Sequence, residues 1–243
     1  MDIDKSKDAT SSLRIITWNC NQNFSSKFSQ LSELNADIWF IQECEELPQD
    51  FFPGKTVLWM GKSVKKGLAV IVPSDYKVEK VEVSNSLIYF LPYRIGEVFL
   101  ISVWAFNNRA RRFGINHSGY LADALQFYDR YITQNSRVII AGDLNNGPRW
   151  DNKKFHRNNF NHIQTELMKR GLSSSYHAFF NEPPGGEKFP THYHHRDFAK
   201  PFHIDYVFTK GFKVSDMTVG NYDKWIIHSD HMPLVINLVS QDS

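Results

Sequence analysis

His203-Ile204-Asp205-Tyr206-Val207-Phe208 is an apolar run rich in β-formers that begins with an imidazole and a carboxylate. Alternation along a strand places Asp205 on the same face as Val207, so its carboxylate would point into the protein. A buried carboxylate is costly unless it is paired or bound to a metal. An imidazole suits this pairing, because the carboxylate sets its tautomer and raises its pKa. The stretch therefore predicts a strand that begins in a functional site.

Four further places in the chain combine an apolar run with polar side chains at its end. Apolar strand ends that converge on one edge of a sheet form a typical active site. These places are Asn19 after Leu13-Arg14-Ile15-Ile16-Thr17-Trp18, Glu43 after Ile38-Trp39-Phe40-Ile41-Gln42, Asp143 and Asn145 after Arg137-Val138-Ile139-Ile140-Ala141-Gly142, and Ser229-Asp230-His231 before Leu234 to Val239.

The triplet Asp143-Leu144-Asn145 suits phosphoryl chemistry. If the strand continues, both polar side chains share one face. The carboxylate can then orient and deprotonate a water, and the amide can bind a phosphate oxygen without adding negative charge. The alternative is a turn, since Gly-Asp and Asn-Asn-Gly-Pro are strong turn signals. The residues alone leave both interpretations open.

Glu43 follows a strongly apolar strand and offers the hard oxygen ligands that Mg²⁺ prefers. The alternative is a solvated charge just outside the strand, which is the interpretation for Glu45 and Glu46. His192 and His194 would share a strand face, but without accompanying cysteines a dedicated zinc site is disfavoured. His192 could instead face a phosphate.

The composition predicts one domain with a sizeable core, because 42% of the 243 residues are hydrophobic. We expect residues 1–12 to be a disordered tail and residues 13–243 to be a single catalytic domain. The net charge of +2 provides no global basic field for nucleic acid. No apolar run has the roughly 18 residues needed to span a bilayer, and no signal-peptide core is visible. Cys20 and Cys44 are interpreted as buried inert thiols in a reducing cytoplasm, with a regulatory disulfide as the alternative.

The periodicity predicts two packed sheets with helices outside, rather than a regular βαβ array. Helices are expected at Phe24 to Leu34, Gly119 to Thr133 and Asn161 to Arg170. Further strands are expected at Lys55 to Met60, Gly67 to Val72, Tyr76 to Val83, Leu87 to Leu91, Glu97 to Trp104 and Phe212 to Val219, with irregular structure and short strands over residues 173–200.

The chain resembles the endonuclease/exonuclease/phosphatase superfamily from Ile15 to Val239. Each shared motif is short, but five of them in the right order form a specific signal. The motifs are Thr17-Trp18-Asn19, Ile41-Gln42-Glu43, Gly142-Asp143-Leu144-Asn145, Ile204-Asp205-Tyr206 and Ser229-Asp230-His231-Met232-Pro233-Leu234. The resemblance implies a four-layered α/β sandwich, with two mixed, mainly antiparallel sheets flanked by helices. It also implies metal-dependent phosphoester cleavage, usually with Mg²⁺ and with Mn²⁺ as a substitute.

The resemblance also implies roles for individual residues. Glu43 is similar to the principal metal ligand, with Asn19 and Asp230 close to the metal. Asp143 resembles the residue that aligns or activates the attacking water. Asn145 resembles the amide that orients the phosphate. His231, oriented by Asp205, resembles the imidazole that binds the phosphate. Phosphoryl transfer needs an aligned nucleophile and neutralised oxygens, which agrees with these roles.

One position departs from the family pattern. Many members carry a Tyr or His after the strand Val98-Phe99-Leu100-Ile101-Ser102-Val103, where this chain has Trp104. An indole can donate one hydrogen bond or stack, but it cannot act as an acid. Asn107 does match an amide that assists phosphate binding. The difference argues against close kinship with abasic-site endonucleases and suggests another substrate group, or an acid supplied by another residue.

Two basic segments are candidates for substrate contacts. Arg109-Ala110-Arg111-Arg112 would lie near the site, and its Arg111 and Arg112 could hold a nucleic-acid backbone. The segment from Arg149 to His162 alternates basic and aromatic residues over Arg149 to Arg157, which suits stacking on bases. A solvated loop and core packing are the respective alternatives.

The leading hypothesis is a monomeric, cytoplasmic, Mg²⁺-dependent nuclease acting on DNA or RNA, without a membrane partner. A second enzymatic hypothesis is a phosphatase or phosphodiesterase for a nucleotide, a phosphorylated sugar or a lipid headgroup. A catalytically silent binding module is the third. The full set of costly polar residues argues against this last class, because a silent module has no need of them.

Overall fold

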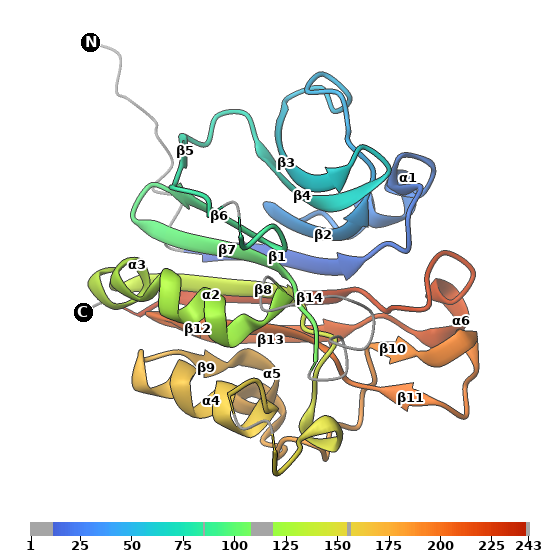
Figure 1. The fold of residues 1–243 in the computed structure, drawn as a ribbon. Coiled ribbons are helices and arrows are strands. Elements are labelled where there is room, and N and C mark those ends of the chain that lie inside the picture. The colour runs from blue at the N-terminus through green and yellow to red at the C-terminus, as the bar shows by residue number, and fades with distance from the viewer. Residues whose placement is uncertain (1–11, 85, 108–118, 155–156, 242–243) are drawn as a thin grey trace.

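Two six-stranded β-sheets lie face to face in the computed structural model (Figure 1), which describes residues 12–84, 86–107, 119–154 and 157–241. The first sheet has the order β13 (Phe212–Val219), β14 (Leu234–Ser240), β1 (Ser12–Asn19), β2 (Ile38–Cys44), β4 (Lys66–Pro73) and β3 (Lys55–Ser63). The second has the order β5 (Val78–Lys80), β6 (Phe90–Ile95), β7 (Val98–Trp104), β8 (Arg137–Asp143), β12 (Asp205–Lys210) and β9 (Ser173–Ser174). The pairs β1–β2 and β7–β8 are parallel and the other neighbours are antiparallel, so both sheets are mixed.

Strand alternation builds the core between the sheets and a second apolar layer outside each sheet. On β8, Ile139 packs between the sheets, whereas Ile140 packs beneath the helices. On β1, Ile15 points inward and Ile16 points outward. The central strands are therefore buried on both faces, which explains why they occur in the sequence as nearly continuous apolar runs.

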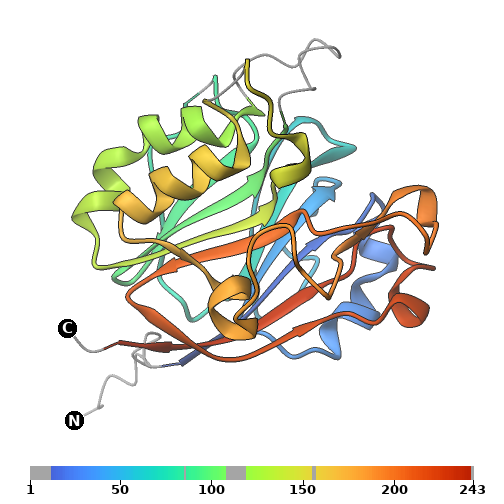
Figure 2. The same ribbon diagram turned by 90° about the horizontal axis from the view of Figure 1, so that it is seen from below.

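Helices cover the outer face of each sheet, which completes the predicted four layers (Figure 2). The second sheet is covered by α2 (Leu121–Phe127), α3 (Asp129–Gln134) and α4 (Phe160–Lys169). The first is covered by the 3₁₀ helix η1 (Phe24–Ser26), α1 (Phe28–Ser32) and α6 (Tyr222–Trp225). The remaining elements are η4 (Pro148–Trp150), α5 (Ser175–Phe180) against β12 and β13, η5 (His194–Arg196), and the two-stranded sheet of β10 (His192–Tyr193) and β11 (Pro201–Phe202).

Several element boundaries differ from the sequence-based predictions. The helix predicted from Gly119 to Thr133 is two helices, separated at the fully buried Tyr128, whose φ of −90° and ψ of 12° are not helical. Neither Gly nor Pro marks this break. The strand predicted from Leu87 to Leu91 is instead Phe90–Ile95, because Pro92 lies within the strand rather than ending it. The helix predicted from Phe24 to Leu34 is divided into η1 and α1, and α5 was not predicted.

The predicted disordered tail, residues 1–12, lies outside the described residues except for Ser12, which begins β1. Cys20 and Cys44 are buried free thiols. Within the described part of the chain, no helix is long and apolar enough to cross a bilayer.

One edge of the sandwich collects the strand ends that the sequence marks with polar residues. Asn19 lies opposite Gln42 at the ends of β1 and β2, and Asp143 lies opposite both Trp104 and Asp205. By alternation from Ile15, Phe40 and Ile139, the Asn19, Gln42 and Asp143 positions belong to the inward faces of their strands. Polar groups thus cap one end of the apolar core between the sheets.

Candidate active site

Asp143 and Asp205 form the centre of this polar edge. They are register partners at the end of β8 and the start of β12, and both are fully buried. Their strands are antiparallel, so the end of one meets the beginning of the other. Two carboxylates at such close quarters repel each other in a medium that solvates them poorly. Their neighbours must therefore supply hydrogen bonds and positive charge.

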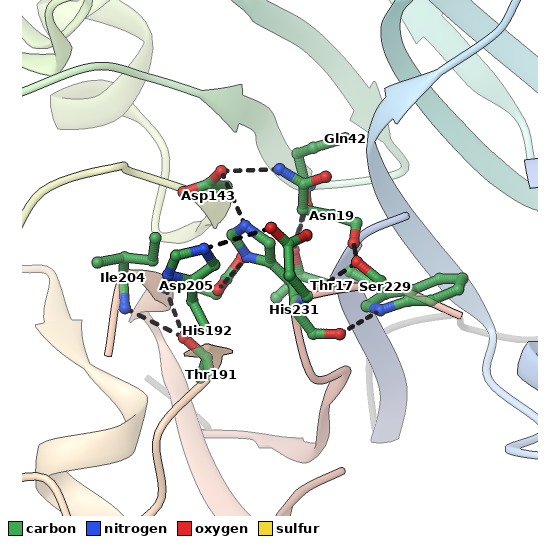
Figure 3. Close-up of polar contacts among 12 residues, drawn as sticks. Thr17, Asn19, Gln42, Asp143, Thr191, His192, Ile204, Asp205, Ser229 and His231 are labelled. Carbon is green, nitrogen blue, oxygen red and sulfur yellow. Dashed lines mark hydrogen bonds and ion pairs between the residues drawn. The ribbon is translucent and has the colours of Figure 1, made fainter. Parts of the chain in front are cut away.

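Three N–H groups from two asparagines bind the Asp143 carboxylate. Oδ2 accepts from Asn19 Nδ2 at 2.9 Å and from Asn145 Nδ2 at 3.0 Å (Figure 3 shows the Asn19 contact), and Oδ1 accepts from the Asn145 backbone N–H at 2.7 Å. Asn145 has a φ of 46°, a left-handed conformation that asparagine tolerates. The turn interpretation of Asp143-Leu144-Asn145 is thus correct, and the turn folds the amide of Asn145 back onto Asp143.

His231 lies between the two carboxylates (Figure 3). Its Nδ1 is 2.9 Å from Asp205 Oδ2, and its Nε2 is 4.0 Å from Asp143 Oδ2. Burial disfavours the imidazolium, but attraction to Asp205 and Asp143 outweighs it and raises the pKa of His231 to about 10. The imidazole is therefore cationic at neutral pH, with Nδ1–H directed at Asp205 and Nε2–H available for an anionic ligand.

Burial, followed by repulsion from Asp205, raises the pKa of Asp143 to about 7. The charge of His231 and the amide hydrogen bond of Asn19 act in the opposite direction. A carboxyl with a pKa near neutrality can both accept and release a proton under physiological conditions. Asp143 therefore has the protonation behaviour of a general base.

The segment that carries His231 is tied to the end of β1. Ser229 Oγ donates to the Asn19 carbonyl at 2.7 Å and accepts from the His231 backbone N–H at 3.0 Å. The indole of Trp18 donates to the His231 carbonyl at 2.9 Å. The contacts with Asn19 and Trp18 join residues more than two hundred positions apart in the sequence, and all three contacts fix the backbone from which the imidazole projects.

His192 and Asp230 form a second pair beside His231. Their closest atoms, His192 Nε2 and Asp230 Oδ2, are 3.5 Å apart. The ring centroids of His192 and His231 are 4.5 Å apart. Asn21 Nδ2 donates to Asp230 Oδ1 at 3.0 Å. Burial favours the neutral carboxyl of Asp230, but the contact with His192 and the charge of His231 outweigh this effect and hold its pKa below the usual value. Asp230 is therefore ionised, and its carboxylate oxygens could be ligands to a metal.

Glu43 lies in a β-bulge at the end of β2, where the pairing with β4 shifts between Gln42 and Cys44. Its φ of 59° is rare for this residue type, and bulges often redirect a side chain at a functional site. Its carboxylate forms an ion pair with Lys66, with Glu43 Oε2 2.7 Å from Lys66 Nζ. Within the described residues, no hydrogen bond or ion pair joins Glu43 directly to Asp143, Asp205, Asp230 or His231.

The donor chemistry of this edge fits a hard divalent cation. Two overlapping groups, His192 with Asp230 and His231, and Asp143 with Asp205 and His231, have potential ligand atoms within 4.8 Å of one another. A doubly protonated His231 offers no lone pair, which leaves the carboxylate and amide oxygens and His192 as possible metal ligands. The buried Asp205 Oδ1 has no hydrogen-bond partner among the described residues. Oxygen donors of this kind match Mg²⁺ or Mn²⁺.

The remaining predicted residues differ in how the structure places them. Asn107 Nδ2 donates to the Asn145 carbonyl at 2.7 Å, which supports the turn after β8. Trp104 lies beside Asp143 on the neighbouring strand. Arg111 and Arg112 lie outside the described residues.

Three contributors to the site were not predicted. Thr191 Oγ1 accepts the backbone N–H groups of Ile204 and Asp205, both at 3.1 Å, and so fixes the start of β12. Asn21 links Asn19 to Asp230, and Lys66 neutralises Glu43. The loop sequence Asn-Cys-Asn-Gln-Asn is a turn signal that could have indicated Asn21. No local pattern distinguishes Lys66 from the other lysines of its hairpin.

Comparisons with known proteins agree with this architecture. The model of the Endonuclease/Exonuclease/phosphatase family matches residues 16–231. A search of curated proteins found no match. Similar solved structures include a 3′-5′ exonuclease, NExo, from Neisseria meningitidis, with 20% identity, a TM-score of 0.69, and coverage of 95% of this chain and 100% of that one.

Two further structures show the same fold in other organisms. The AP endonuclease LMAP from Leishmania major has 13% identity and a TM-score of 0.68, with coverage of 99% of this chain and 91% of that one. Truncated TDP2 from Caenorhabditis elegans has 17% identity and a TM-score of 0.64, with coverage of 94% and 98%. At such identities the likeness establishes the fold.

The paired carboxylates predict that His231 keeps its proton at about pH 8 in metal-free protein, where an ordinary histidine is neutral. Because its pKa is raised on folding, the His231 contribution to stability is complete below about pH 6.5 and is lost as the pH rises toward about 10. Asp205→Asn should lower the imidazole pKa, as followed by NMR, whereas Asp216→Asn on the exposed part of β13 should not. A neutral His231 at that pH in the unsubstituted protein would contradict this assignment.

Proposed function

Because the chain belongs to the Endonuclease/Exonuclease/phosphatase family, we propose that it is a divalent-metal-dependent phosphodiester hydrolase, most specifically a nuclease. The observation that carries the proposal is the position of His231, whose Nδ1 lies 2.9 Å from Asp205 and whose Nε2 lies 4.0 Å from Asp143. A phosphoryl group bound beside them would meet a hydrogen-bond donor for its oxygens and a base for the attacking water.

Asp143 is the proposed general base. Its carboxylate takes the proton of the attacking water, and its raised pKa makes the transfer feasible near neutral pH. The amides of Asn19 and Asn145 hold this carboxylate in one orientation. Asn145, itself supported by Asn107, is also the proposed amide that orients the phosphate.

His231 is the proposed phosphate-binding cation. Asp205 accepts the Nδ1 proton, so the Nε2 proton remains free to bind a non-bridging oxygen as charge develops there. His192 packs against this imidazole and is proposed to contact the substrate, as are Arg111 and Arg112. The division of labour between an ionised base and a protonated imidazole follows from their different environments.

Glu43 and Asp230 are the proposed metal ligands, with the Asn19 amide oxygen near them. All three supply hard oxygen atoms, and the contacts of Asn21 hold Asn19 and Asp230 together. When bound, Mg²⁺ or Mn²⁺ would neutralise charge on the phosphate oxygens. Lys66 would have to share Glu43 with the cation, or release it.

DNA is the favoured substrate because of what the similar structures are said to act on. They include a 3′-5′ exonuclease and an AP endonuclease, and one variant of the 3′ phosphatase NExo was determined with a product DNA hairpin. For this chain we likewise propose DNA as the substrate, a cytoplasmic location and a monomeric state.

A substrate screen tests the nuclease proposal. With Mg²⁺ or Mn²⁺, the protein should cleave DNA or RNA oligonucleotides faster than inositol phosphates, sphingomyelin or a bis-aryl phosphate, and EDTA should abolish cleavage. Salt should inhibit strongly, because phosphate contacts release counterions, and Arg111→Ala with Arg112→Ala should reduce this salt dependence. Hydrolysis confined to small molecules, with no salt effect, would support the small-molecule phosphoesterase instead.

Substitutions test the proposed roles. Asp143→Asn, Glu43→Ala and His231→Ala should each reduce kcat by about 10²–10⁴-fold, because each removes a group that acts on the transition state. Asp75→Asn, in an exposed turn after β4, is the matched control and should keep its activity. Circular dichroism should show that all four variants remain folded. Near-normal hydrolysis by the three site variants would remove the proposed mechanism.

A further inference from the structure

A small cleft lies beside the proposed active site, between the β3–β4 hairpin and the end of β7. Its volume is about 160 Å³, and Lys62, Lys66, Tyr89 and Trp104 are among its lining residues. Two contacts connect it to the site. Trp104 is the register partner of Asp143, and Lys66 forms the ion pair with Glu43. The cleft therefore adjoins the position where a substrate phosphate would be cleaved.

The cleft has aromatic walls. Tyr89 and Trp104 meet edge to face, with centroids 5.5 Å apart and planes at 82°, and Phe106 packs against both rings. The Trp104 backbone N–H donates to the Tyr89 carbonyl at 3.0 Å, which fixes the two residues relative to each other. Both side chains are only half-buried. A planar ring could therefore pack against aromatic surface that remains accessible.

Two lysines lie against these aromatic rings. Lys62 Nζ is 5.6 Å from the Tyr89 centroid, and Lys66 Nζ is 5.0 Å from the Trp104 centroid. Lys66 is already paired with Glu43, whereas the exposed Lys62 has no ion-pair partner within the described chain. Aromatic surface flanked by unpaired positive charge suits a base attached to a phosphate, because stacking and charge then act on the same ligand.

One polar atom of the cleft residues lacks a partner. The indole N–H of Trp104 is buried, and nothing in the described part of the chain accepts a hydrogen bond from it. Buried donors of this kind are costly and are usually satisfied. Trp104 lines the cleft, and a ligand oxygen that reached this N–H would satisfy it. The volume is similar to the roughly 150 Å³ of a cavity that holds one benzene ring, so the six-membered ring of a base fits it.

We propose that the cleft of Lys62, Lys66, Tyr89 and Trp104 binds the nucleobase adjoining the cleaved phosphate, and that Lys62 contacts the neighbouring backbone phosphate. This inference rests on the proposed nuclease function. It makes Tyr89 and Lys62 determinants of substrate binding on the Trp104 side of the site. It also gives Trp104 a binding role at the position where many family members carry a Tyr or His.

The test uses single-stranded DNA oligonucleotides in which one nucleoside at a time, around the cleavage position, is replaced by an abasic spacer. At one position the spacer should raise KM of the unsubstituted protein about tenfold, with kcat nearly unchanged. Tyr89→Leu should raise KM for the intact oligonucleotide to a similar extent and should show no further spacer penalty. Tyr89→Phe keeps the ring and should retain the penalty.

Two matched controls distinguish the cleft from general effects. Tyr131, whose ring stacks on Phe99 beneath the helices, should tolerate replacement by Leu without a change in the spacer penalty. Lys62→Ala should reduce the salt slope of binding by about 0.7, whereas Lys213→Ala on the exposed face of β13 should not.

The outcomes separate this proposal from the one on which it rests. Cleavage with a spacer penalty that persists unchanged in Tyr89→Leu would overturn the cleft proposal alone. No cleavage of any oligonucleotide would overturn the nuclease proposal, and the base-binding role would fail with it. Loss of the penalty in Tyr89→Leu, with retention in Tyr89→Phe, would establish the cleft as a base-binding subsite.

Discussion

The burial of Asp143 and Asp205 side by side is the constraint on which the site depends. Two adjacent carboxylates in a poorly solvating interior are unfavourable, and the surrounding residues offset this cost. His231 contributes a positive charge between them, and the amides of Asn19 and Asn145 contribute hydrogen bonds to Asp143. The same arrangement raises the pKa of both Asp143 and His231. The contacts that offset the cost of burial therefore also set the protonation of both groups.

The sandwich brings these groups together by geometry rather than by sequence proximity. Parallel pairing of β1 with β2 and of β7 with β8 places four strand ends on one edge, and antiparallel β12 and β14 begin there. The segment Ser229–His231 then closes onto the end of β1 through the contacts of Ser229 and Trp18. Strands buried on both faces hold the edge rigid, while the side chains beyond their ends remain available for chemistry.

Much of this arrangement could be predicted from sequence, because buried strands followed by polar residues are visible as patterns. The pairing of Asp205 with an imidazole was expected, and the structure makes His231 the partner, while His203 binds the Phe189 carbonyl. Long-range choices were not predictable. The break at Tyr128 depends on tertiary packing, and the ion pair of Glu43 with Lys66 depends on a bulge in β2. Local periodicity contains neither kind of information.

We propose above all that Asp205 acts through His231. A double-mutant cycle on kcat, with Asp205→Asn, His231→Ala and the combination, tests this most directly. If the two residues act as a unit, the double variant should be no slower than His231→Ala alone, and the coupling should exceed about 1.4 kcal/mol. Independent, multiplicative losses in the double variant would contradict the claim.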